Sequence, residues 1–376
     1  MYMKKKDGLR TWIEIDTKKL KDNYTEFRKI AGKDCMLMAI TKSNAYGHGL
    51  LDFSKTIKKF GADWLGVDSI VEALALRKAG VRMPILVLGY TLPELYRDAA
   101  RGNISVTISN LVALNAAVGA ATRTNPLRVH IKIDTGMHRQ GFLPDDIAKI
   151  FPYFKKKNTG LRFEGVYTHF AAAKNPAFPK DTEAQIALFE RVLDAVHHAG
   201  FRPIRHASAT SGTILFHKAH YDMIRIGIGM YGLWPSKEAE AVFNRQLRIK
   251  PILTWKTIIS EVKELTAGSR VGYDFTEELG RHSVVAICPV GYWHGYPRSL
   301  SSVGYFIVRG KKAKILGRVS MDMIIIDVTD INGVEVGDEA TIIGEGVSAD
   351  TLAYMSDTSN YEIVTRINPL IKRIYK

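Results

Sequence analysis

The sequence predicts a (β/α)8 barrel of the TIM-barrel type, followed by a mostly β domain. The chain has 376 residues, which exceeds the usual size of a single domain and favours two. Short apolar runs alternate with helical patterns up to about residue 240, and this alternation predicts parallel strands joined by crossover helices. We therefore expect a barrel over residues 17–240, and a mostly β domain built from residues 1–16 together with 241–376.

The alternation begins with an amphipathic helix over 17–31, in which Leu20, Tyr24, Phe27 and Ile30 recur at helical spacing. Eight strands are then predicted at 36–40, 64–67, 84–88, 104–108, 129–133, 165–168, 205–207 and 223–226. Helices are predicted between them at 51–60, 70–79, 92–101, 111–120, 145–154, 182–198 and 211–218. Eight such units match the size of a TIM barrel.

A doubly wound open sheet is the structural alternative to the barrel. An open sheet would gather its ligand site at a single switch point between strands. Here the polar, chemically active residues follow many different strands, and only a barrel brings all of those strand ends to one mouth. This distribution favours the barrel.

After about residue 240 the pattern changes to strands separated by turn signals such as Asn332-Gly333 and Gly337-Asp338. Strands are predicted at 253–262, 284–289, 305–308, 313–319, 323–328 and 339–343, with one short helix at 349–355. Short strands with glycine-rich turns are typical of a separate, mostly β domain.

Composition favours a cytoplasmic enzyme. The two cysteines, Cys35 and Cys288, are too few for a disulfide framework, which suits a reducing compartment. The basic start, Met1 to Lys6, lacks an apolar segment behind it, and no apolar run is long enough to span a membrane. The net charge of +15 would suit a nucleic-acid-binding protein, but the lysines are scattered, including solvated runs at 155–157 and 311–312, and no such motif is present.

The residues that follow the predicted strands carry the candidate chemistry. Lys42 follows the first strand, Asp134 to Arg139 the fifth, His169 the sixth, and Ser208 to Gly212 the seventh, while Arg225 lies on the eighth. The last two loops are rich in hydroxyls and glycines, and Thr210, Ser211, Gly227 and Ile228 could bind an anion there. These positions predict one site at the barrel mouth.

A lysine at the end of a strand suits covalent chemistry with a carbonyl, because a desolvated pocket with cationic neighbours favours the neutral, nucleophilic amine. Such a lysine with a distant phosphate site suggests pyridoxal phosphate. In isolation, Lys42 would be interpreted as a solvated loop lysine. The sequence around it changes that interpretation.

Several motifs together resemble the alanine racemase family. The segment Ala39-Ile40-Thr41-Lys42-Ser43-Asn44-Ala45-Tyr46-Gly47-His48-Gly49 is similar to the family's cofactor-lysine signature. Further matches are found at 10–16, 130–139, 223–233, 270–273 and 317–322, in the family's order. The resemblance covers essentially the whole chain and implies a pyridoxal-phosphate-dependent isomerase that interconverts L- and D-alanine, in the cytoplasm, to supply cell-wall precursors.

The resemblance implies two catalytic residues, Lys42 and Tyr273. Lys42 would hold the cofactor and act as one acid/base, and Tyr273 would be the opposing base. In the family this tyrosine comes from the partner subunit, which implies a homodimer with shared active sites. Racemisation needs bases on both faces, since one removes the α-proton and the other returns one from the far side. Without the resemblance, Tyr273 could equally be a packed strand residue.

The remaining cofactor contacts follow in the same way. Arg225 would contact the pyridine nitrogen and keep it unprotonated, which limits side reactions. His169 would hydrogen-bond Tyr273, and His206 would support Arg225. Singly, each histidine would be interpreted as a core residue and the arginine as part of a salt bridge. The phosphate would be held by Tyr46, Thr210, Ser211, Gly227 and Ile228.

Substrate contacts complete the implied site. Arg139 would bind the cofactor's phenolic oxygen and the substrate carboxylate, and Lys132 matches a position that is carbamylated in some family members. Tyr292 and Met321 would narrow the entrance and contact the substrate, although ordinary loop packing would also explain them. The resemblance implies no metal ion.

Two positions depart from the family pattern. Pro369 stands where a tyrosine usually contacts the phosphate and crowds the substrate side chain, and proline offers no such donor. Trp293-His294-Gly295 stands where Ala-Asp-Gly is usual. Both changes predict turnover of serine as well as alanine. Two other classes of protein are alternatives. A decarboxylase of the same architecture would place a carboxylate at the pyridine nitrogen. A non-catalytic cofactor-binding barrel would lack the β domain.

Overall fold

The computed structural model describes residues 8–156 and 160–376. The basic start of the chain and Lys157 lie outside the described residues. The chain forms two compact units, one of Lys19–Ala45 and Leu50–Lys250, the other of Met1–Lys18, Tyr46–Gly49 and Pro251–Lys376. The expected domain boundaries near residues 16 and 240 stay a prediction. A feature that no sequence pattern indicated is that Tyr46–Gly49, four residues after Lys42, belongs with the second unit.

The first unit is the predicted barrel, which is confirmed. Its eight parallel strands are β2 (Met36–Ile40), β3 (Trp64–Val67), β4 (Ile85–Val87), β5 (Ser105–Ile108), β6 (Leu127–Lys132), β7 (Leu161–Tyr167), β8 (Ile204–His206) and β9 (Met223–Ile226). Hydrogen-bonded pairing runs in chain order from β2 to β8, and β9 pairs with β2. Asp222 N donates to Arg205 O at 3.0 Å and Arg225 N to Ser208 O at 3.0 Å, which brings β8 and β9 together and nearly closes the barrel.

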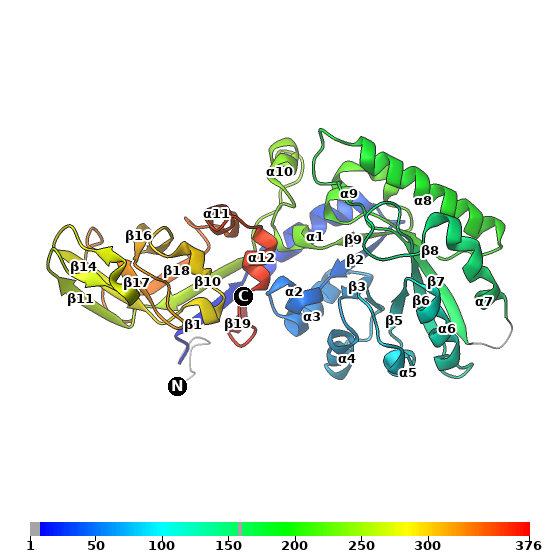
Figure 1. Ribbon diagram of the computed structural model, residues 1–376, viewed down its shortest axis with the longest axis horizontal. Coiled ribbons are helices and arrows are strands. Elements are labelled where there is room, and N and C mark those ends of the chain that lie inside the picture. Colours follow the sequence, from blue (N-terminus) through cyan, green and yellow to red (C-terminus); the bar gives the residue numbers. More distant parts are fainter. Residues whose placement is uncertain (1–7, 157–159) are drawn as a thin grey trace. The chain divides into compact units, whose positions relative to one another are not determined.

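Helices surround these strands in the first unit (Figure 1). They are α1 (Thr17–Ala31), α3 (Leu50–Phe60), α4 (Ile70–Lys78), α5 (Tyr96–Arg101), α6 (Leu111–Ala120), α7 (Phe151–Lys155), α8 (Lys180–His198), α9 (Thr210–Leu215) and α10 (Lys237–Phe243). The helix expected over 145–154 is instead a 3-10 helix, Pro144–Ile150, followed by α7. Pro152 explains the division, because it has no N–H to continue the helical hydrogen bonds across that point.

The second unit contains a nine-stranded sheet ordered β11-β14-β17-β16-β15-β18-β10-β1-β19. Its strands are β1 (Thr11–Ile15), β10 (Leu253–Ile258), β11 (Glu261–Leu265), β14 (Ser283–Cys288), β15 (Tyr305–Val308), β16 (Lys311–Leu316), β17 (Ile324–Asp327), β18 (Glu339–Ile343) and β19 (Lys372–Tyr375). Residues 253–262 form two strands because the chain changes partners: Ile259 N donates to Asp338 O, and Ser260 N to Ile287 O.

Two short helices lie between β18 and β19, α11 (Ala349–Met355) and α12 (Asn360–Thr365). The first was predicted and the second was not. Ser359 caps α12 by accepting a hydrogen bond from Glu362 N, so a serine with a glutamate three residues later was an available helix-start signal. Among the described residues, no helix is both long and apolar enough to cross a membrane.

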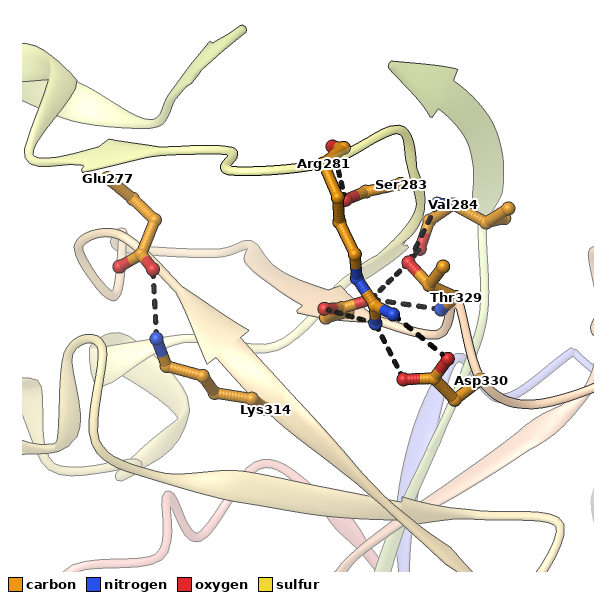
Figure 2. Close-up of polar contacts among 8 residues, drawn as sticks. Glu277, Arg281, Ser283, Val284, Lys314, Thr329 and Asp330 are labelled. Carbon is orange, nitrogen blue, oxygen red and sulfur yellow. Dashed lines mark hydrogen bonds and ion pairs between the residues drawn. The ribbon is translucent and has the colours of Figure 1, made fainter. Parts of the chain in front are cut away.

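Ion pairs fasten the turns at one end of this sheet (Figure 2). Arg281 donates to both carboxylate oxygens of Asp330, at 3.1 and 2.6 Å. Glu277 lies on a small two-stranded ribbon, β12 (Arg270–Val271) and β13 (Glu277–Glu278), and pairs with Lys314 of β16 at 2.9 Å. Glu277 also accepts from Ser302 Oγ at 2.8 Å. The ribbon that carries the segment 272–276 is therefore tied to the main sheet.

Candidate active site

Lys42 stands at the carboxyl end of β2, before an unusual stretch of backbone. The next four residues, Ser43 to Tyr46, all have φ between 51° and 56°, the left-handed region. Each such non-glycine residue costs about 1–2 kcal/mol, so the turn must be held by its surroundings. Asn44 supplies part of that support, since its N–H donates to Glu72 Oε1 at 3.2 Å and its Oδ1 accepts from Leu50 N at 2.9 Å. These contacts hold the backbone next to Lys42 and so fix the position of its Cα.

The amine of Lys42 lies within the first unit, 3.7 Å from Asp68 Oδ1. Its side chain is 39% exposed, which leaves the amine accessible to a reactant. The ion pair holds the side chain toward the loop after β3. Lys42 therefore lies at the carboxyl end of the barrel strands, beside the loop after β3, with its amine partly exposed.

Tyr46 and the glycines after it are held by the second unit. Gly47 has φ of +80°, and a Cβ there would lie 1.9 Å from Val364 O, so this position requires glycine. The buried Arg373 donates to Gly47 O through both Nε, at 3.0 Å, and Nη2, at 2.8 Å. The ring of Tyr46, itself 8% exposed, packs against Tyr361 with centroids 6.1 Å apart. The segment 46–49, which follows Lys42 in the chain, is thus fixed by C-terminal residues.

Arg225, on β9, is only 2% exposed and is anchored by its terminal nitrogens. Nη2 donates to Thr168 O at 2.9 Å and to Ala207 O at 2.7 Å, and Nη1 contacts His206 Nδ1 at 2.9 Å. Burial lowers the pKa of this guanidinium to about 10. Among the described residues, no hydrogen bond uses its Nε, which leaves that donor for a ligand.

His169 is kept neutral by burial and by the cationic side chains around it. Burial and then the charges of Arg225 and Arg139 lower its pKa to about 3. Its Nδ1 lies 3.2 Å from Arg225 Nη2, and since arginine can only donate, Nδ1 carries no proton and shares one of the Nη2 hydrogens that also bond the carbonyls of Thr168 and Ala207. The proton of the neutral ring is therefore on Nε2, which can donate to a phenol.

Lys132, on β6, is a buried amine with cationic neighbours. Burial, followed by the charges of Arg139 and Arg225, lowers its pKa to about 8. Its Nζ lies 3.5 Å from Gln140 Oε1 and 5.7 Å from the centroid of the Tyr167 ring. About a quarter of such an amine is neutral at pH 7.5, against about one part in a thousand for an ordinary lysine. Arg139 itself is exposed.

The candidate anion site forms where α9 meets the loop after β9. The Thr210 hydroxyl accepts from Gly227 N at 3.2 Å and from Gly229 N at 3.4 Å. A Cβ at Gly229 would lie 2.4 Å from Phe27 and 2.7 Å from the Thr210 side chain, so only glycine allows this close approach. Thr210 and Ser211 are buried at the start of α9, and Ile228 begins the adjacent 3-10 turn. The structure brings all these residues together.

Tyr273 lies in the second unit and is 69% exposed, on the segment carried by β12 and β13. Its neighbours Asp274 and Phe275 have φ of 58° and 52°. Arg318 pairs with Asp274 at 3.0 Å, and the Arg270 guanidinium lies 4.7 Å from the centre of the Phe275 ring. The tyrosine is therefore presented on a short, fastened turn rather than packed within a strand.

Tyr292 and Met321 lie on two loops of the second unit that run together. Tyr292 N donates to Ser320 O at 3.0 Å and Trp293 N to Met321 O at 3.1 Å. A Cβ at Gly291 would lie 2.2 Å from Ser320 O, so glycine permits the approach. Both side chains are about half exposed, at 42% and 52%, and are free to contact a ligand.

One residue that supports the site, Gln185, was not predicted from the sequence. Gln185 of α8 donates to Thr135 Oγ1 at 3.2 Å and accepts from Ala171 N at 2.9 Å, which ties together the loops after β6 and β7. No motif singled it out, because a glutamine in an amphipathic helix carries no pattern. Among the described residues, no cluster of three or more His, Cys, Asp or Glu side chains could hold a metal ion.

The fold and site define an amino-acid isomerase built from a barrel and a β domain. The alanine racemase N-terminal domain family matches residues 15–235, and the C-terminal domain family matches 252–375. The alanine racemases of Halothermothrix orenii and Leptospira interrogans are 39% and 38% identical over 382 and 381 residues, covering 100% and 98% of this chain and 99% and 96% of theirs. The chain belongs to the alanine racemase family and is, by that membership, a racemase.

Solved structures agree with this assignment. An alanine racemase of Clostridium difficile superposes with a TM-score of 0.93 at 29% identity, covering 98% of this chain and 96% of that one. The alanine racemase of Bacillus anthracis, solved with bound L-Ala-P, gives a TM-score of 0.90 at 31% identity, covering 98% and 95%. Both domains of the fold are therefore shared with these proteins.

Proposed function

We propose that this protein interconverts L- and D-alanine with pyridoxal phosphate as its cofactor. The observation that carries the proposal is Arg225, a buried guanidinium held by its terminal nitrogens so that Nε remains to meet a ring nitrogen. Family membership supports the substrate. A decarboxylase is disfavoured, because an acidic side chain would be needed where Arg225 stands.

The residues present fit the cofactor. A lysine amine at a strand end, a buried cationic donor and an anion site of hydroxyls and backbone N–H groups match an aldehyde, a ring nitrogen and a phosphate. Lys42 would hold the aldehyde carbon, Arg225 the pyridine nitrogen, and Thr210, Ser211, Gly227, Ile228 and Tyr46 the phosphate. When bound, the cofactor supplies an electron-withdrawing ring that acidifies the α-carbon of the substrate.

Lys42 and Tyr273 are the proposed acid/base pair. The Lys42 amine would remove or return the α-proton on one face, and the phenolic oxygen of Tyr273 on the other. His169 would assist, because its Nε2–H can donate to a phenolate and stabilise the basic form of Tyr273. His206 would support Arg225 through the contact at 2.9 Å.

Arg139 would bind the substrate carboxylate, with Lys132 holding Arg139 in place after carbamylation. Carbamylation joins the neutral lysine nitrogen to carbon dioxide and releases one proton, so the lowered pKa of Lys132 favours it. The resulting carboxylate would pair with Arg139. An intact mass increased by one carbamate and assigned to Lys132, or a carbamate signal after supplying labelled carbon dioxide, tests this step.

The proposed enzyme is a homodimer in which each Tyr273 serves the partner's site, with Tyr292 and Met321 narrowing the entrance. The exposure of Tyr273 supports this, since a catalytic phenol left 69% exposed within one chain suits completion by a second copy. The two buried free cysteines support a reducing, cytoplasmic location. Supply of D-alanine for the cell wall is the proposed role.

Serine racemisation is a second candidate activity. Pro369 is exposed at the C-terminal turn where the family usually has a tyrosine, and it removes both a hydroxyl and a bulky ring. A larger substrate side chain would then be accepted.

A chiral assay over a panel of amino acids tests the proposed function, with Lys42→Ala and Tyr273→Phe as controls. We expect interconversion of the alanine enantiomers without gas release, and loss of it in both variants. Borohydride should bleach the absorbance of the cofactor-loaded protein. Wild-type protein loaded with pyridoxal phosphate that leaves both alanine enantiomers unchanged would contradict the proposal.

A further inference from the structure

A line of three side chains, His206, His130 and the partly buried Glu164, leads from Arg225 away from the barrel mouth. Arg225 Nη1 contacts His206 Nδ1 at 2.9 Å, His206 Nε2 contacts His130 Nδ1 at 2.8 Å, and His130 Nε2 contacts Glu164 Oε2 at 3.3 Å. Both histidines are fully buried. The line crosses three neighbouring strands, β8, β6 and β7, in the interior of the barrel.

Chemistry fixes the direction of every hydrogen bond in this line. Arginine can only donate, so His206 Nδ1 accepts and the His206 proton is on Nε2. His206 Nε2–H then donates to His130 Nδ1, which leaves the His130 proton on Nε2. That proton is donated to Glu164, whose carboxylate can only accept. A cation at one end and an anion at the other therefore select one tautomer for each ring.

Glu164 is placed by a local irregularity and is held as an anion. The pairing of β6 with β7 shifts register between Val129 and His130, so that Glu164 is skipped and His130 pairs with Gly165. Such a bulge redirects a side chain. Burial raises the pKa of Glu164. Hydrogen bonds from His130 and Ser105 and the charge of Arg128 lower it by a larger amount, so the pKa lies below its ordinary value.

The residues around the line pack closely against its two histidine rings. A Cβ at Gly165 would lie 2.1 Å from His130 Nδ1, so glycine is required opposite that ring. The rings of Tyr167 and His206 stack with centroids 4.7 Å apart and an interplanar angle of 7°. Trp64 packs edge-on against His130 at 5.4 Å. Both histidine rings are therefore packed against aromatic neighbours.

The line of hydrogen bonds stabilises the buried charge of Arg225. Within the described part of the chain, no carboxylate lies within ion-pair distance of Arg225. An unpaired buried charge is costly, and polarised hydrogen bonds that end on an anion reduce that cost. Glu164 is the anion that this line reaches.

We propose that His130 and Glu164 are positioning residues that hold His206 as the Nε2–H tautomer, and through it fix Arg225 toward the cofactor. This rests on the proposed function for its role in turnover, whereas the tautomers themselves belong to the chain alone. His206 in the other tautomer, or doubly protonated, would present an N–H to the arginine and would displace it.

The test begins with the full-length protein, unloaded and loaded with pyridoxal phosphate, labelled with nitrogen-15 in its 11 histidines. Long-range proton–nitrogen correlation distinguishes the two neutral tautomers and the doubly protonated ring. His130→Gln and His206→Gln assign the two sets of signals. We expect Nε2–H neutral rings for both residues in both states. Either ring found as Nδ1–H or doubly protonated overturns the proposal.

Three variants test the role of Glu164 in turnover. Glu164→Leu leaves the His130 Nε2–H without an acceptor, so we expect mixed tautomers and a kcat lowered about 10-fold or more, as when outer hydrogen-bond partners are removed at other sites. Glu164→Gln keeps an acceptor oxygen and should restore both the tautomers and most of the rate. Arg128→Met removes the ion pair at 3.3 Å beyond Glu164 and serves as the matched control, with tautomers unchanged.

The outcomes separate this proposal from the proposed function. Wild-type rate and tautomers in Glu164→Leu would overturn the positioning role, as would a Glu164→Gln variant no better than Glu164→Leu. Where Glu164→Leu does not fold, the wild-type tautomers and the rate of Glu164→Gln decide. Absence of racemisation in the wild type would remove the proposed function, and the tautomer measurement on the unloaded chain would still stand or fall by itself.

Discussion

Replacing Arg373 tests how the C-terminal strand holds the segment 46–49, which follows Lys42. Arg373 is 9% exposed and donates to three carbonyl oxygens at short range: Gly47 at 2.8 Å, Asn368 at 2.7 Å and Ile371 at 2.5 Å. Arg373→Met fills similar space but provides no donor. Each abandoned carbonyl costs about 1–1.5 kcal/mol, so we expect the free energy of unfolding to fall by about 3–5 kcal/mol.

The assay is urea unfolding followed by circular dichroism and by tryptophan fluorescence. Arg373→Lys is the matched control: it keeps the charge, but one ammonium cannot reach all three carbonyls, and we expect about half of the loss. Because Gly47 follows Tyr46, affinity for pyridoxal phosphate should fall with the stability. A loss below about 1 kcal/mol in Arg373→Met would refute the reasoning.

Three further predictions concern the barrel and the substrate. Gly165→Ala would place a Cβ 2.1 Å from His130 Nδ1, so we expect a loss of more than about 3 kcal/mol in urea unfolding, whereas Gly119→Ala, with open space around it, should change little. In buffer freed of carbon dioxide, where Lys132 is an unmodified amine, its pKa of about 8 lies below the unfolded value, so the unfolded chain binds more protons and stability should rise with pH between about 8 and 10.5. The rise should be smaller in Lys132→Met when the two proteins are compared by unfolding at pH 7.5 and 9.5. Pro369→Tyr should lower kcat/KM for serine relative to alanine by about 10-fold, and an unchanged ratio in a chiral assay would contradict the enlarged pocket.

The barrel could be predicted because its strands are buried on both faces. Their sequences are therefore continuous apolar runs. The run 36–40 and the run 223–226 match β2 and β9 residue for residue. The break between β10 and β11 was not predictable, because the sequence there stays strand-like while the chain exchanges one partner for another. Pairing is a tertiary property and leaves no local signal.

Site residues that lie within sequence motifs could be predicted. Residues that contribute only through packing and hydrogen bonding could not. Lys42 and Arg225 stand in long matched segments, whereas Glu164 acts through a bulge and Arg373 through carbonyl oxygens far away in the chain. The left-handed turn after Lys42 was also hidden, because Ser43 and Ala45 have no tendency toward positive φ. Such strain is imposed by the surrounding fold.

Exchange of the α-proton with deuterated water in Tyr273→Phe tests the central claim of two opposed bases most directly. With Lys42 intact and Tyr273 unable to accept a proton, the variant should exchange the α-proton of one alanine enantiomer only, with racemisation nearly abolished. The wild type should exchange both. Equal exchange of both enantiomers by Tyr273→Phe, or unimpaired racemisation, would contradict the assignment of Tyr273 as the second base.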